Sequence, residues 1–82
     1  MMKRNIIGKK VRTIRKAKKL TQEELTARIQ VKGLNIDRPM LSRIETNSRE
    51  VYDFEVKAIA EALNVSIDEL FANNLYNRVG AK

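Results

Sequence analysis

The side chains of this sequence that could do chemistry are mostly charged, because the 82-residue chain contains neither cysteine nor histidine. Without cysteine there can be no disulfide, thiolate metal site or thiol nucleophile. Without histidine the usual general base and the commonest metal ligand are also missing. Glu23 and Glu24 could be read as a catalytic acid pair, but acids in the first turn of a helix are better explained by the helix dipole. We therefore predict a protein with no enzymatic activity, metal or cofactor.

Basic residues are concentrated in the first part of the chain. Lys and Arg number 17 against 10 Asp and Glu, a formal net charge of +7. Residues 50–71 carry six acids and only Lys57 as a basic residue. A surface that only confers solubility would mix the signs, so this asymmetry favours a polyanion that one end binds and the other repels. The first 20 residues hold nine basic side chains and no acid: Lys3, Arg4, Lys9, Lys10, Arg12, Arg15, Lys16, Lys18 and Lys19.

Apolar residues recur at spacings of three and four through nearly the whole chain, which predicts helices. The expected helices cover residues 5–18, 22–32, 38–46, 54–63 and 67–72. Five short helices with brief connections imply one compact all-α domain over residues 1–71, followed by a short tail over 72–82. In the tail only Leu75, Tyr76 and Val79 are candidates for packing. No apolar run is long enough for a membrane span or a signal peptide, so we expect a cytoplasmic protein.

Local capping signals place the helix ends. Thr21 with Glu24, and Ser66 with Glu69, are spaced as capping boxes. Gly33 is a plausible end for the second helix. Asp37 is a good N-cap for the third helix, although Arg38, which precedes a proline, is an alternative cap. The side chains expected to face inward are Ile7, Val11, Ile14, Leu25, Ile29, Leu41, Ile44, Phe54, Ala58, Ile59, Ala62, Leu63, Ile67, Leu70 and Phe71.

Three fragments carry a family resemblance: LTQEEL at residues 20–25, LSRIE at 41–45 and AIAEALNVSIDELF at 58–71. In this order, after a basic first helix, they resemble the Xre family of lambda-repressor-like, Cro/C1-type helix-turn-helix regulators. The likeness covers residues 7–71. It implies a five-helix fold in which the second and third helices form a helix-turn-helix that binds double-stranded DNA.

The resemblance also implies roles for individual side chains. Positions that read base edges in the family are occupied by Arg38, Pro39 and Arg43. Gln22 occupies a position that contacts backbone phosphate and braces the recognition helix in the family, and positions that touch phosphate or the adjacent groove are occupied by Ser42, Asn47 and Arg49. Independently of the resemblance, the free amides where the second helix begins, at Thr21, could also bind a phosphate. Arg15 and Glu45 match a partly buried salt bridge between the first and third helices, which would explain a carboxylate close to a DNA surface.

The chemistry of the expected base contacts follows from the side chains. The planar fork of arginine matches O6 and N7 of guanine in the major groove. Pro39 can offer only apolar contact, for example to a thymine methyl group, and Met40 could do the same or pack inward. Because this patch has few hydrogen-bonding groups, we expect DNA shape to contribute to specificity.

The link between the second and third helices departs from the family pattern. Thr26 and Gln30 replace the small residue and the glycine that the family often has. The link is also longer by about five residues, or roughly one and a half helical turns. We expect a longer second helix, a stop at Gly33 and a loop anchored by Leu34 and Ile36.

These observations favour a sequence-specific transcriptional regulator, expected to be a repressor that binds an operator as a homodimer. Two alternatives stay open. One is an antitoxin whose acidic C-terminal half also neutralises a small protein partner. The other is an RNA-binding protein, although the few aromatic side chains are not interleaved with basic ones as in single-strand binders.

Overall fold

All regular structure within residues 5–72, the part of the chain that the computed structural model describes, is helical. The helices are α1 (Gly8–Ala17), α2 (Gln22–Val31), α3 (Arg38–Glu45), α4 (Asp53–Leu63) and α5 (Ile67–Phe71). The all-α prediction is confirmed, with each helix close to its expected position. The expected packing of Leu75, Tyr76 and Val79 lies outside the described residues.

A single apolar core joins all five helices. Its most deeply buried side chains come from the segment before α1, from every helix and from the α2–α3 connection: Ile7, Val11, Leu25, Ile29, Ile36, Leu41, Ile44, Ile59, Leu63 and Leu70. Burial of this many branched side chains is the main force that holds so short a chain together.

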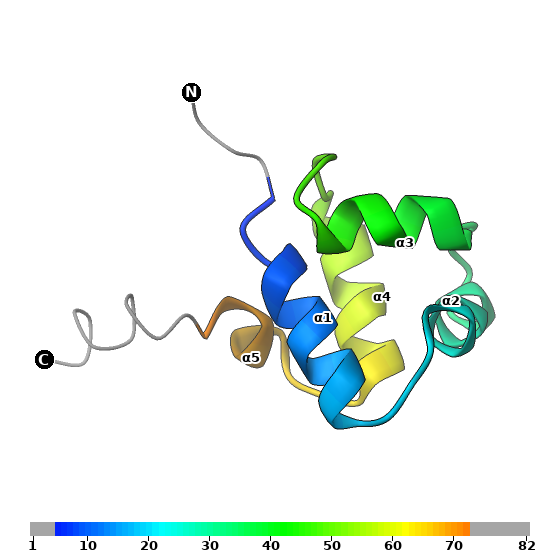
Figure 1. The fold of residues 1–82 in the computed structure, drawn as a ribbon, viewed down its shortest axis with the longest axis horizontal. Helices are drawn as coiled ribbons and strands as arrows, with labels where there is room; N and C mark the ends of the chain where they lie inside the picture. Colours follow the sequence, from blue (N-terminus) through cyan, green and yellow to red (C-terminus); the bar gives the residue numbers. More distant parts are fainter. Residues whose placement is uncertain (1–4, 73–82) are drawn as a thin grey trace, which may run out of the picture.

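Helix α4 runs through the middle of the molecule (Figure 1). It packs against α1, α2 and α5, while α3 packs against α1 and α2. Helix α5 lies on the side of α1 that faces away from α2 (Figure 1). One face of α1 and one face of α2 therefore support α3.

The capping boxes are present as the sequence predicts. Thr21 Oγ1 accepts from the amide of Glu24 at 3.0 Å, and Glu24 Oε1 accepts from the amide of Thr21 at 2.8 Å. Ser66 and Glu69 form the equivalent pair before α5. Helix α1 begins later than residue 5, because Asn5 Oδ1 accepts from the amides of Ile7 and Gly8. Asn5 thus acts as a cap outside the helix.

Three apolar side chains that were expected inside lie at the surface. Phe54 is 57% exposed, Ile67 is 44% exposed and Phe71 is 43% exposed. Phe54 stacks on Tyr52 with a centroid distance of 5.7 Å and an interplanar angle of 16°, so the two rings partly cover each other. The prediction was wrong here because Phe54, Ile67 and Phe71 lie near the ends of α4 and α5, where the neighbouring helices do not fully cover them.

Candidate DNA-binding interface

Helix α3 has a buried face and an exposed face. Leu41, Ile44 and Glu45 are buried, whereas Arg38, Pro39 and Arg43 are exposed. Met40 is half-buried and packs against the core. The three side chains that the family resemblance assigned to base contacts therefore all lie on the outside of α3.

The start of α3 is fixed by Asp37, whose side chain accepts from the amide of Met40 at 2.9 Å. Arg38 is consequently the first residue of the helix and not its cap. Pro39 lies in the first turn, where its missing N–H costs no helical hydrogen bond. The cap and the proline define where the exposed face of α3 begins.

The connection that leads to α3 is a loop and not an extension of α2. Helix α2 ends at Val31, and Gly33 has a φ of +97°, which a residue without a Cβ adopts without strain. Ile36 is buried in the core, and its carbonyl accepts from Gln30 Nε2 at 3.1 Å. Helix α2 therefore ends within one residue of its expected end, just before Gly33, and the loop is anchored by Ile36, and by a half-buried Leu34, as predicted.

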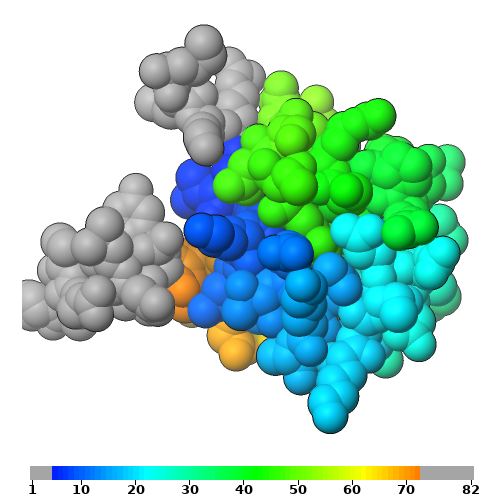
Figure 2. Space-filling view, in the orientation of Figure 1, coloured from blue at the N-terminus to red at the C-terminus, as the bar shows by residue number. Residues whose placement is uncertain are grey.

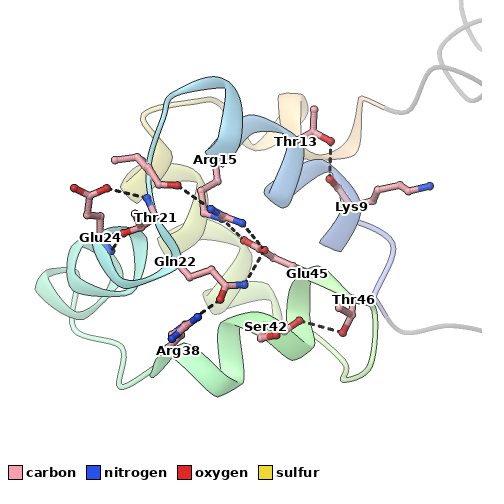
Figure 3. Close-up of polar contacts among 11 residues, drawn as sticks. Lys9, Thr13, Arg15, Thr21, Gln22, Glu24, Arg38, Ser42, Glu45 and Thr46 are labelled. Carbon is pink, nitrogen blue, oxygen red and sulfur yellow. Dashed lines mark hydrogen bonds and ion pairs between the residues drawn. The ribbon is translucent and has the colours of Figure 1, made fainter.

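A buried ion pair holds the C-terminal end of α3 against α1 (Figure 3). Arg15 Nε donates to Glu45 Oε2 at 2.6 Å, and Arg15 Nη2 donates to Glu45 Oε1 at 3.0 Å. Arg15 Nη1 also donates to the carbonyl oxygen of Leu20 at 2.8 Å. This bidentate geometry is the strong form of an arginine–carboxylate contact. The ion pair implied by the family resemblance is thus present.

Gln22 extends this network to the other end of α3. Its Nε2 donates to Glu45 Oε1 at 3.1 Å, and its Oε1 accepts from Arg38 Nε at 3.2 Å. Arg38 also lies 3.8 Å from Glu23 Oε2, with both side chains largely exposed. Gln22, at the start of α2, therefore forms hydrogen bonds to residues at both ends of α3.

A family model for helix-turn-helix domains of the Cro/C1 type matches residues 11–70. The chain belongs to the Xre-like helix-turn-helix family. It is accordingly a DNA-binding transcriptional regulator with a lambda-repressor-like fold. No curated protein and no solved structure matches the chain. Within residues 5–72, no helix combines the length and the apolar character needed to cross a membrane.

The residues expected to contact phosphate come from the start of α2, from α3 and from the segment that follows α3. Thr21 caps α2, and Ser42 is half-buried on α3. Asn47 follows α3 in a left-handed conformation with a φ of 60°. Its Oδ1 is buried and has no hydrogen-bond partner among the described residues. Gln22, Ser42 and Asn47 line one common cleft, and Thr21 does not.

Arg49 is paired within the domain. Its Nη1 and Nη2 donate to the two carboxylate oxygens of Glu55 at 3.2 and 3.1 Å. Glu55 Oε1 also accepts from the amide of Tyr52 at 3.0 Å, which caps α4. The sequence analysis did not find this pair. A spacing of six residues across a turn is not a recognised helical pairing, so no local signal indicated it.

Proposed function

We propose that this helix-turn-helix protein is a sequence-specific repressor that binds an operator as a homodimer, with α3 in the major groove. The observation that carries the proposal is the division of α3 into a buried face and an exposed one. Arg38, Pro39 and Arg43 are free of core packing, while Leu41, Ile44 and Glu45 fix the helix. A helix held in this way can present two arginine forks to base edges at a constant angle.

Selection of bound duplexes from a random pool tests sequence specificity and symmetry together. We expect one consensus with two inverted half-sites whose centres are about one helical turn apart, as two-fold symmetric dimers require. Sedimentation of the protein with the selected duplex should give two chains per duplex. Equal binding to every duplex, lost at moderate salt, would contradict a specific regulator.

A purified transcription reaction tests repression. The protein should lower the transcript yield from a promoter in which the selected site has been placed. The matched control is the Arg43→Gln variant, which keeps the buried face of α3 intact. We expect this variant to repress less at equal concentration. Increased transcription with the wild-type protein would contradict the repressor role and leave DNA binding in place.

A second candidate function is neutralisation of a basic protein partner, as in an antitoxin. The observation that favours it is the exposed surface of α5, where Ile67 and Phe71 flank the acids Asp68 and Glu69. An apolar patch with acidic neighbours suits a basic partner with an apolar anchor. Titration with the product of an adjacent small gene tests it, and the expected result is a complex that Phe71→Ser weakens. A complex unaffected by Phe71→Ser would contradict this use of α5.

A further inference from the structure

Asn5 is a polar side chain in the interior of the domain, only 4% exposed. Its Oδ1 accepts from the amides of Ile7 and Gly8, at 3.1 and 3.0 Å, and so caps the start of α1. Its Nδ2 donates to the carbonyl oxygen of Ile44 at 2.7 Å, across 39 residues of chain. One buried amide group therefore joins the start of α1 to the last turn of α3.

The backbones of α1 and α3 approach each other closely at this bond. A Cβ added at Gly8 would collide with the carbonyl oxygen of Ile44 and with Asn47 Oδ1. Glycine at this position thus leaves the room that α3 needs to come within reach of Asn5. In Figure 2 the start of α1 and the C-terminal end of α3 lie side by side on one face of the molecule. The bond from Asn5 is consequently part of a direct contact between the two helices.

The C-terminal end of α3 is attached to α1 at two separate points. The first is the carbonyl oxygen of Ile44, held by Asn5 beside Gly8. The second is the carboxylate of Glu45, held by Arg15 at 2.6 Å. Gly8 and Arg15 are seven residues apart, which is about 10 Å along a helix. A helix attached at one point can turn about that point, whereas a second attachment at this distance resists the turn.

We propose that Asn5 is a positioning residue for sequence recognition, which through Ile44 sets the angle at which α3 meets the DNA. A turn about the Arg15–Glu45 pair would displace Arg38 most, because Arg38 is seven residues, or about 10 Å, from Glu45. Hydrogen bonds to base edges weaken steeply with misalignment, whereas the attraction to backbone charge does not. The inference rests on the sequence-specific binding proposed above and adds to it a residue that is buried within the domain.

Asn5→Asp separates the two roles of this side chain. Aspartate keeps the oxygen that caps α1 and is as good an N-cap as asparagine. At about pH 8 its carboxyl group is ionised and has no hydrogen to donate, so two oxygens face each other where the bond to Ile44 was. We expect the ratio of the affinities for the selected duplex and for an unrelated duplex to fall by about fivefold or more, the lower end of what one bidentate base contact provides. Fluorescence anisotropy with labelled duplexes measures both affinities.

The ratio of the two affinities distinguishes positioning from stability. A variant that is only less stable has a smaller folded fraction, which lowers both affinities by the same factor and leaves their ratio unchanged. Ser66→Ala is the matched control, because it removes the N-cap of α5, a helix that packs against α1 and α4. We expect this control to melt at a lower temperature than the wild type and to keep the wild-type ratio.

Asn5→Ser decides the question if the aspartate variant does not fold. Serine can also cap α1, but it lacks the amide donor and adds no charge, so we expect a smaller fall of the ratio in the same direction. A wild-type ratio in the folded Asn5 variants, or an equal fall in Ser66→Ala, would limit Asn5 to a role in stability. The inference would then be wrong and the proposed function would stand. A wild-type protein that binds both duplexes equally overturns the proposed function and the inference together.

Discussion

The two ends of α3 are held in different ways. Near its C-terminal end Glu45 is buried and lies 2.6 Å from Arg15. At its N-terminal end Arg38 is 62% exposed and lies 3.8 Å from Glu23. A buried pair is costly to break because the remaining charge is left without water or a partner. An exposed pair contributes little, because water replaces either partner.

The C-terminal end of α3 therefore attaches the helix to the domain, and the N-terminal end is available to contact DNA. The Arg15–Glu45 pair fixes α3 to the domain, whereas Arg38 can leave Glu23 and Gln22 for a base or a phosphate at small cost. Gln22 bonds to both Glu45 and Arg38, so the exposed end is positioned from the anchored one. Four sets of substitutions test this difference between the two ends.

The largest expected effect is on the anchored end. Arg15→Ala and Glu45→Ala should each lower the free energy of unfolding by about 3–5 kcal/mol, because each leaves an unpaired buried charge. The measurement is urea unfolding followed by circular dichroism. The double variant Arg15→Met, Glu45→Leu is the control and should recover part of the loss, since no buried charge remains. A single variant that unfolds like the wild type would remove the anchoring role.

Gly8→Ala tests the contact between α1 and the end of α3. Within a helix, alanine is normally more stable than glycine by about 1 kcal/mol. Here the added Cβ would collide with Ile44 O and Asn47 Oδ1, so we expect a loss of about 1–3 kcal/mol instead. Thermal melting gives the sign directly. A more stable variant would mean that the two helices can separate at no cost.

Arg43→Gln tests the reading face without touching the anchor. We expect unchanged melting and a loss of about 1–3 kcal/mol of discrimination at one base position, the usual value of a bidentate arginine–guanine contact. Repeating the duplex selection with the variant should show a relaxed preference at that position only. A uniform loss of affinity over all sequences would assign Arg43 to the backbone.

The smallest expected effect is at the exposed pair. Glu23→Gln removes a carboxylate that competes with DNA for Arg38, so affinity should rise by up to about fivefold, the equivalent of 1 kcal/mol. Glu24→Gln is the matched control, because it removes the same charge and glutamine can still complete the capping box. Equal gains in both variants would indicate a general charge effect and not competition for Arg38.

Local signals predicted most of the helices. Each capping box, at Thr21 and at Ser66, depends on two residues three positions apart. Both partners can therefore be recognised within one short stretch of sequence. The stop near Gly33 needs only a residue that accepts a positive φ. The buried stripes followed from the helical repeat, since Leu25 and Ile29, or Leu41 and Ile44, share one face.

Contacts between residues far apart in the sequence were harder to predict. Arg15 and Glu45 were paired only through the family resemblance, because nothing in their spacing of 30 residues brings them together. The bond from Asn5 Nδ2 to the carbonyl oxygen of Ile44, at 2.7 Å, was not predicted at all. Phe54 and Phe71 have the spacing of core residues, and only the arrangement of neighbouring helices leaves them exposed. Such outcomes depend on tertiary packing and not on local propensity.

The division of α3 into anchored and exposed positions has a consequence for how such a protein can change over time. Leu41, Ile44 and Glu45 are buried and stabilise the position of α3, whereas Arg38 and Arg43 are not part of the core. Substitutions at the outer positions are therefore nearly neutral for folding, within about 0.5 kcal/mol for ordinary surface sites. A duplicated copy of this gene could acquire a new target site through a few substitutions at the exposed positions of α3, without passing through a variant that fails to fold.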